Sequence, residues 1–243
     1  MKNYPITLKP FGEKAILIEW PIMVEEGILF DIIRFKTVLE TEFNTNFELI
    51  PAYNSITIIS NTEDFNFTDL EEKIPKLYQT KRTLIETKRT LWKLPVCYDP
   101  EFGIDLDEVA SNLKMTSSEL IKIHSSQKYT VYGIGFLPGF MYLGGLPKTI
   151  ETKRRETPRL KVEKGAVGLA GKQTGIYPQE SPGGWNIIGN CPIPIFNANT
   201  DDPCFVNVGD KIEFESISRA AYELHKIECE IGIYKPEKIA LDA

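Results

Sequence analysis

The sequence predicts an α+β domain over residues 1–88, followed by a mainly-β barrel domain over residues 89–243. In the first part, strand-like and helix-like segments follow one another, as in α+β domains. In the second part, short β-rich segments are separated by Gly and Pro turns, and most of the chain's 17 glycines fall between positions 133 and 189. Many short strands joined by such turns are typical of a closed or nearly closed barrel. The boundary is expected near Arg82–Leu91.

The expected N-terminal domain contains strands and two amphipathic helices. Four apolar segments indicate strands: Ala15–Trp20, Phe47–Ile50, Ser55–Ser60 and, just past residue 88, Leu91–Tyr98, which the order of elements groups with this module. One helix is expected over residues 24–42, because apolar residues recur on one face at Ile28, Ile32, Phe35, Val38 and Leu39. A second is expected over residues 67–84, with a kink or break at Pro75. This order suggests a split β-α-β, ferredoxin-like module.

The barrel domain is expected to begin with two short helices, over Asp105–Leu113 and Ser117–His124. Glu119 follows Thr116 by three positions, the spacing of a capping box at the start of the second helix. From residue 129 onward, strands are expected over 129–136, 166–170, 186–189, 193–197 and 211–216.

Composition narrows the classes of function. The net charge of −6 disfavours binding to nucleic acid, whose backbone is also negative. No apolar run is long enough to cross a bilayer, and the N-terminal segment lacks the apolar core of a signal peptide, so we expect no membrane association and a cytoplasmic location. The four cysteines form no C-x-x-C pair and the chain has two histidines, so no metal site is expected and the thiols should be reduced.

Two familiar phosphate-binding motifs are excluded. Lys172 resembles the lysine of a P-loop, but Gln173 follows it where Ser or Thr is required, and Ala166 stands where the loop needs glycine. The segment from Gly133 begins like a dinucleotide-binding fingerprint, but Pro138 replaces its last glycine. Ser181 lacks the G-x-S-x-G setting of an activated nucleophile.

Polar side chains within the glycine-rich loops are the main candidates for a site. Gln173, Thr174, Tyr177 and Ser181 offer amide, hydroxyl and phenol groups, although they can equally satisfy the loops' own backbone. Pro138-Gly139 and Pro182-Gly183-Gly184 form turns, or else aim backbone N–H groups at an anion. Trp185 suits the core better than a stacking platform.

Two charged or titratable features allow alternative interpretations. The basic segment from Lys153 to Lys164 is read as a solvated surface ribbon, but Arg159, which follows Pro158 between the loops, can clamp a carboxylate or phosphate. His124 closes a predicted helix, where it serves either in proton transfer or as a packing and capping residue. His225 is interpreted as structural.

Long ordered motifs also carry a family resemblance. The segments LPVCYDPEFGIDLDEVA, IKIHSSQKYTVYGIGFLPGFMYLGGLP and TPRLKVEKGAVGLAGKQTGIYPQESPGGWNIIG closely resemble the B subunit of 5-oxoprolinase, a family also called KipI or allophanate hydrolase subunit 1. The resemblance covers about the last 150 residues strongly and KPFGEKAILIEW more weakly. It implies a small α+β domain followed by a cyclophilin-like β-barrel.

The resemblance implies one component of an enzyme that opens the ring amide of 5-oxo-L-proline with ATP, giving L-glutamate, ADP and phosphate, together with the A and C subunits. Within the matched motifs, we expect Arg159 and Lys172 to contact an anion, Gln173 and Tyr177 to contact the amide, and His124 to transfer a proton. The neighbouring loops complete the expected binding site with Gly135, Phe136, Pro138, Gly139, Ser181, Gly183, Gly184 and Trp185. ATP is expected at the level of the complex.

Two alternatives and one departure accompany this assignment. The KipI name implies an inhibitor that binds a sensor histidine kinase, and related modules form the carboxyltransferase half of a biotin-dependent urea carboxylase. The family commonly has Arg-Thr directly after IIG, whereas this chain has Asn190-Cys191. An asparagine replaces neither the charge nor the bidentate geometry of an arginine, so the exact substrate stays open at this point.

Overall fold

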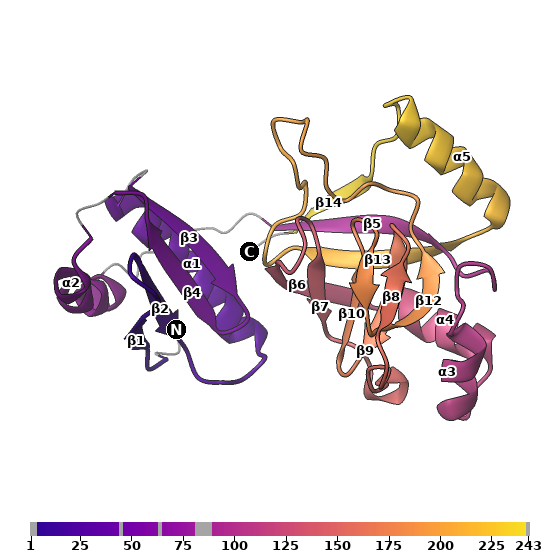
Figure 1. Ribbon diagram of the computed structural model, residues 1–243, viewed down its shortest axis with the longest axis horizontal. Helices are drawn as coiled ribbons and strands as arrows, with labels where there is room; N and C mark the ends of the chain where they lie inside the picture. The colour runs from indigo at the N-terminus through magenta and orange to yellow at the C-terminus, as the bar shows by residue number, and fades with distance from the viewer. Residues whose placement is uncertain (1–3, 44–45, 63–64, 81–88, 242–243) are drawn as a thin grey trace. The chain divides into compact units, whose positions relative to one another are not determined.

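A computed structural model of the chain describes residues 4–43, 46–62, 65–80 and 89–241 (Figure 1). It divides into two compact units, one ending at residue 88 and one over Arg89–Asp242. The expected boundary near Arg82–Leu91 falls largely on residues 81–88, outside the described residues. The first unit combines helices with an antiparallel sheet, and the second is built around a β-barrel, so an α+β part and a β-rich part are both present.

The sheet of the N-terminal unit contains β1 (Thr7–Pro10), β2 (Ala15–Glu19), β3 (Phe47–Ala52) and β4 (Ser55–Ser60). Its order is β1-β2-β4-β3, and every neighbouring pair is antiparallel. Helix α1 (Glu26–Phe43) connects β2 to β3, and β4 returns between them, which is a split β-α-β arrangement. Strand β1 pairs with the free side of β2 and forms an edge of the sheet. The sequence analysis did not predict a strand at Thr7–Pro10.

The strand expected over Leu91–Tyr98 was grouped with this module, and this part of the prediction is wrong. It corresponds to β5 (Arg89–Cys97), which pairs with strands of the barrel. The amino-acid pattern correctly indicates a strand, but pairing partners far along the chain decide which sheet it joins.

The core of the N-terminal unit forms from the predicted apolar stripe. Ile28, Ile32, Phe35, Val38 and Leu39 of α1 are all buried. Helix α2 (Phe67–Thr80) continues through Pro75, so the expected break does not occur. Buried Ile74, Leu77 and Tyr78 flank the proline and hold both sides of the helix against the core. The remainder of the predicted helix, residues 81–84, lies outside the described residues.

The second unit contains a closed ring of strands. These are β5, β6 (Lys128–Ile134), β7 (Met141–Gly144), β9 (Ala166–Ala170), β10 (Gln173–Ile176), β12 (Asn186–Asn190) and β13 (Lys211–Ile217). The order β12-β9-β10-β7-β6-β13-β5 closes on itself because Asn190 of β12 pairs with Cys97 of β5. Strand β14 (Glu237–Leu241) adds to the outer side of β5. Closure protects the edges of the short strands.

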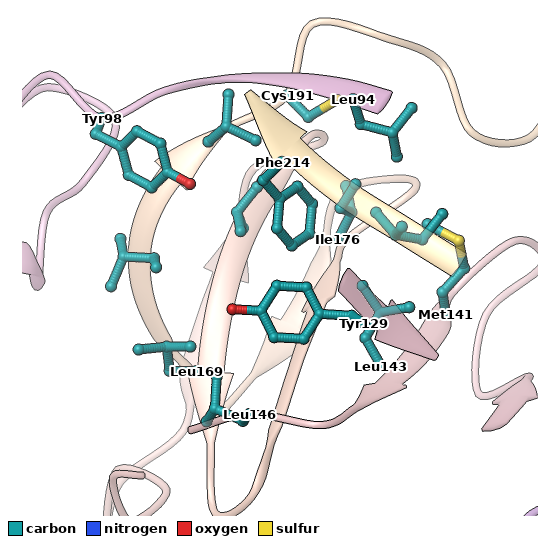
Figure 2. Packing of buried hydrophobic residues seen from close by; sticks show 14 of the residues in the cluster. Leu94, Tyr98, Tyr129, Met141, Leu143, Leu146, Leu169, Ile176, Cys191 and Phe214 are labelled. Carbon is teal, nitrogen blue, oxygen red and sulfur yellow. The ribbon is translucent and has the colours of Figure 1, made fainter. Parts of the chain in front are cut away.

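Large apolar side chains fill the interior of this ring. Figure 2 shows Tyr129, Phe214 and Leu169 pointing toward one another from three different strands. All three are fully or almost fully buried. The barrel interior is therefore a packed core.

Helices and a small two-stranded sheet surround the barrel. Helix α3 is Leu106–Asn112 and α4 is Ser117–Ser125, while α5 (Arg219–Glu230) lies apart from them in Figure 1. The predicted capping box is confirmed, because Thr116 accepts from the Glu119 backbone and the Glu119 carboxylate accepts from the Thr116 backbone. A short 3₁₀ helix covers Lys148–Ile150. Strands β8 (Arg159–Val162) and β11 (Ser181–Gly183) pair with each other outside the ring.

The strand expected over residues 193–197 does not form, and this prediction is wrong. Pro192 and Pro194 lack the N–H groups that a strand donates to its neighbour. Ile193 and Ile195 are nevertheless buried in the barrel core. The apolar alternation was therefore a signal of burial and not of β-structure.

Among the helices of the described residues, none has the length and apolar character that crossing a membrane requires.

Candidate functional site

Strand β10 carries candidate residues on both of its faces. Thr174 pairs with Leu169, whose side chain belongs to the barrel core, whereas Gln173 pairs with Ala170, which belongs to a second cluster outside it. Residues opposite each other on antiparallel strands share a face, and neighbours along a strand alternate. Thr174 therefore points into the barrel and Gln173 points out. The structure thus separates two candidates that are adjacent in the sequence.

On the inner face, His124 forms a closed hydrogen-bond network. Its Nδ1 lies 2.8 Å from the hydroxyl of Tyr98, and its Nε2 lies 2.9 Å from Oγ1 of Thr174. Thr174 donates its own hydroxyl proton to the carbonyl of Gly168. These partners are all satisfied if Nε2 carries the proton, donates to Thr174, and leaves Nδ1 to accept from Tyr98.

The surroundings of His124 keep the imidazole neutral. The ring is fully buried and stacks on Phe214 with 4.8 Å between centroids. Burial lowers the pKa of His124 from 6.5 to about 3, because the charged form loses its hydration. Both ring nitrogens are bonded within the protein, and the ring lies on the inner face of β10. This geometry favours the interpretation of a packing histidine over the proton-transfer role.

On the outer face, aromatic side chains form a second core. The ring of Phe140 meets Phe136, Tyr142, Tyr177 and Trp185 edge to face, with centroids 5.0–5.7 Å apart. Phe140, Tyr177 and Trp185 are buried. Edge-to-face contacts of this kind stabilise a fixed arrangement of the rings. We call Phe136, Phe140, Tyr142, Tyr177 and Trp185 the outer aromatic cluster.

One member of the outer aromatic cluster differs from the rest. Phe136 is 66% exposed, and its φ of 70° lies in the left-handed region, which residues with a side chain seldom adopt. Two hydrogen bonds close its loop. The N–H of Gly135 donates to the carbonyl of Phe140, and the N–H of Phe140 donates to the carbonyl of Leu137. Pro138 is exposed and Gly139 is buried, so the loop presents Phe136 and Pro138 at the surface.

Two glycines allow the loops to approach neighbouring aromatic residues closely. A Cβ at Gly183 would lie 2.3 Å from the Tyr177 hydroxyl, and a Cβ at Gly139 would lie 2.6 Å from Cβ of Phe196. Both distances are shorter than any allowed contact between heavy atoms, so a side chain at either position would displace its neighbour. Gly139 also has a φ of 82°, which favours glycine.

The basic segment is anchored at several points. The Arg154 guanidinium lies 6.0 Å from the Trp185 ring centroid, and the Arg155 N–H donates to the carbonyl of Gly184. Arg155 and Arg159 both donate to Oδ1 of Asp105. Lys161 pairs with Glu163 and Glu180 at the surface. The interpretation of a purely solvated ribbon is therefore wrong for Arg155, and Arg159, which the sequence analysis set apart from the ribbon, is anchored at the same carboxylate.

Arg159 and Tyr177 lie near each other at β8 and β11. Arg159 pairs with Gly183 in the two-stranded sheet, and the same glycine faces the Tyr177 hydroxyl. Burial raises the pKa of Tyr177, and the charges of Arg154 and Arg159 oppose this in part. Among the described residues, Nη1 of Arg159 is buried without a hydrogen-bond partner. A buried donor of this kind is suited to an anionic acceptor.

The other predicted site residues include Lys172, Ser181 and Gly184. Lys172 is exposed at the tip of the β9–β10 hairpin, where Gly171 bridges Thr152. Ser181 is buried and donates to the carbonyl of Pro182. Gly184 is half-buried beside Pro158.

Taken together, the outer face carries the partly exposed side chains of Gln173 and Arg159 and the exposed ring of Phe136, while Tyr177 and Trp185 are buried. Such a set suits a small ligand that has both a carboxylate and an amide. Within the described part of the chain, no group of three or more His, Cys, Asp or Glu side chains is arranged to hold a metal ion.

Comparison with known proteins assigns the family. Residues 6–206 match the family described as carboxyltransferase domain, subdomain C and D. The B subunit of 5-oxoprolinase from Bacillus subtilis is 34% identical over 91% of this chain and 97% of its own length. This chain belongs to the family of 5-oxoprolinase B subunits. The homologue from Escherichia coli O157:H7 is 37% identical over 69% of this chain and 76% of its own length.

Two solved structures have a fold similar to that of this chain. The crystal structure of TTHA0988 matches with a TM-score of 0.73 at 28% identity, and covers 84% of this chain but 40% of its own. The K. lactis urea amidolyase matches with a TM-score of 0.80 over 97% of this chain, and at 18% identity this similarity concerns the fold alone. The match covers 16% of that longer enzyme.

Asn190 stands where the family resemblance leads us to expect arginine, and the structure gives it a structural role. Its side chain donates to the carbonyl of Lys164 at 3.0 Å and accepts from the Tyr222 hydroxyl at 3.1 Å. The buried amide therefore connects β12 to α5 and to the loop before Gly165. In this position Asn190 stabilises the barrel.

Sequence analysis missed two residues that organise the site. Asp105 joins the basic segment to the barrel, and Phe140 is the centre of the outer aromatic cluster. Phe140 lies inside a quoted motif but was not singled out, because buried aromatics are common in cores. The signal for Asp105 was its place as the first residue of a predicted helix, a position that on its own indicates only a helix start.

Proposed function

We propose that this chain is the B subunit of an ATP-dependent 5-oxoprolinase. With homologues of the A and C subunits, in the cytoplasm, it would open the ring amide of 5-oxo-L-proline to L-glutamate while ATP is converted to ADP and phosphate. The observation that carries this proposal is the similarity to the B subunits of 5-oxoprolinases over nearly the whole length of the B. subtilis relative.

The chemistry of the outer face supports a cyclic amide that bears a carboxylate. An amide is a poor electrophile because resonance withdraws the nitrogen lone pair into the carbonyl. Donors at the carbonyl oxygen lower the barrier to attack by stabilising the developing negative charge. In the proposal, Gln173 and Tyr177 contact the amide, and the raised pKa of Tyr177 keeps its phenol protonated as a donor. Arg159 binds the carboxylate.

The remaining residues have supporting roles in this proposal. Phe136 and Trp185 form part of the apolar wall, and Lys172 contributes positive charge at the hairpin tip. The loops with Gly135, Pro138, Gly139, Ser181, Gly183 and Gly184 shape the surface. His124 holds Thr174 from inside the barrel and so fixes β10, from which Gln173 projects outward. We assign ATP to the complex and to no residue of this chain.

Reconstitution with the homologous A and C subunits tests the proposal. Glutamate formation from 5-oxoproline should require ATP and all three subunits. The double variant Arg159→Ala/Gln173→Ala should lose most of the activity, whereas Arg219→Ala/Gln127→Ala, which removes the same side-chain types from surface positions, should keep it. Full activity in the first double variant would refute the site, and the absence of glutamate from the wild-type complex would refute the function.

The proposal includes fold families for the two units. The split β-α-β order of the first unit supports a ferredoxin-like assignment, with β1 in the place of the last strand. The closed ring of the second supports a cyclophilin-like barrel. An experimental structure compared strand by strand with members of both fold families tests these assignments.

A carboxyltransferase role is the second candidate, and the description of the matching family favours it. In that case the chain should support carboxylation of urea by a biotin carrier domain and should show no 5-oxoproline hydrolysis. Inhibition of a sensor histidine kinase stays a prediction from the family resemblance. An autophosphorylation assay with micromolar protein tests it.

A further inference from the structure

Asp105 is held on the barrel by its own backbone and side chain. It lies immediately before α3, and its N–H donates to the carbonyl of Ile187 at 2.9 Å. Its Oδ2 accepts from the N–H of Ile187 at 2.7 Å. The side chain is 3% exposed. Two bonds to one residue of β12 therefore fix where the carboxylate lies and which way it faces.

The other oxygen of this carboxylate faces the basic segment. Oδ1 accepts from Nη1 of Arg155 at 3.0 Å and from Nη2 of Arg159. A buried carboxylate is stable only when it is paired and hydrogen-bonded, so both arginines are drawn toward it. Arg155 has a second partner in Glu108, which is exposed. Asp105 thereby determines the direction of the Arg159 guanidinium.

Arg159 does not use all of its donors in this pairing. A guanidinium presents five N–H donors in a rigid fork, and Nη1 is the buried side-chain atom without a hydrogen-bond partner among the described residues. Asp105 therefore occupies one side of the fork and leaves Nη1, which is buried, without an acceptor in the described part of the chain. A second carboxylate can complete the coordination of the same guanidinium.

We propose that Asp105 is a positioning residue that orients Arg159 for the carboxylate of the substrate. This inference rests on the proposed 5-oxoprolinase function and adds a residue to its site. Asp105 itself touches no substrate atom. Its effect is to restrict rotation of the guanidinium so that Nη1 is presented in one direction. Loss of that restriction should weaken substrate binding more than it slows the bond-breaking step.

Asp105→Asn is the central variant, because it is nearly isosteric. The amide oxygen can still accept from Ile187, but the amide N–H₂ group then faces two guanidinium groups and repels them. In the reconstituted complex we expect KM for 5-oxoproline to rise about tenfold, with kcat changed less. Asp210→Asn is the matched control, since Asp210 is equally buried but bonds to Thr90, Trp92 and Asn207. It should leave KM unchanged.

A double-mutant cycle separates positioning from a general structural effect. In an Arg159→Ala background, Asp105→Asn should raise KM no further, because the group that it positions is gone. A rise by the same factor in both backgrounds would overturn the proposal.

A second measurement is independent of activity. NMR of the arginine side chains in the isolated chain should show restricted rotation of the Arg159 guanidinium in the wild type, and its loss in Asp105→Asn. An Arg159 guanidinium that is equally restricted in both proteins would overturn the proposal. If the wild-type complex forms no glutamate, the proposed function fails, and this NMR comparison alone decides whether Asp105 positions Arg159.

Discussion

His124 should remain uncharged over the whole pH range in which the protein is folded. Its pKa is lowered to about 3 by burial, whereas the usual value is 6.5. Between these two pH values the unfolded chain binds a proton that the folded chain does not. The free energy of unfolding therefore falls as the pH drops below about 6.5, and this contribution levels off near pH 3.

The size of the effect follows from the difference in pKa. Each pH unit below 6.5 costs about 1.4 kcal/mol while the folded histidine stays neutral. At pH 5 the wild type should therefore have lost about 2 kcal/mol of stability through this one group. The variant His124→Gln has no group that titrates there. Its stability at pH 8 will be lower, because it loses the stacked ring, but its dependence on pH between 8 and 5 should be weaker.

Urea unfolding from pH 8 to pH 5 measures this difference. A Trp20→Phe background removes the single tryptophan of the N-terminal unit, so fluorescence then reports on Trp92 and Trp185 of the barrel. The chain has two histidines, so an NMR titration gives two imidazole signals, and the one lost in His124→Gln is assigned to His124. A His124 signal that titrates above pH 5, or equal pH slopes in both proteins, would refute the reasoning.

Two further predictions concern packing around the site. Gly183→Ala should lower the free energy of unfolding by about 1–3 kcal/mol, because its Cβ would overlap the Tyr177 hydroxyl, whereas Gly184→Ala should change it little because its nearest neighbour is at 3.6 Å. Thermal unfolding of both variants checks this, and equal melting temperatures would contradict it. Tyr222→Phe should cost about 1 kcal/mol through the lost bond to Asn190. Asn190→Asp should cost more, because the carboxylate oxygen that replaces the amide nitrogen cannot donate to the carbonyl of Lys164. Chemical unfolding that ranks the two variants in the opposite order would contradict this account.

Local signals in the sequence predicted the long elements well. The apolar spacing of α1 and the Thr116–Glu119 capping box depend on residues within one or two helical turns, so they are readable in sequence. Short strands such as Gln173–Ile176 and Ser181–Gly183 were not predicted as strands. They contain glycine or proline and no clear alternation, and their structure depends on pairing with distant strands.

The site was predictable in composition but not in arrangement. Residues four apart in an extended segment point the same way, which is consistent with Gln173 and Tyr177 sharing the outer face. No pattern in the sequence tells which face is inside, and this depends on the pairing of Thr174 with Leu169. The contact of Asp105 with Arg159 joins residues 54 positions apart, so it follows only from the closed barrel.

The two cores of the barrel unit meet in the wall between them. His124 bonds to Thr174 from inside, and Gln173, the next residue, projects outward. Asp105 bonds to Ile187 of β12 and directs Arg159 on the outer side. Each support is buried and satisfied, so each holds its strand in one conformation. The outer face therefore owes its geometry in part to buried polar contacts, and for this reason the chemical reactivity of side chains alone does not single out Asp105.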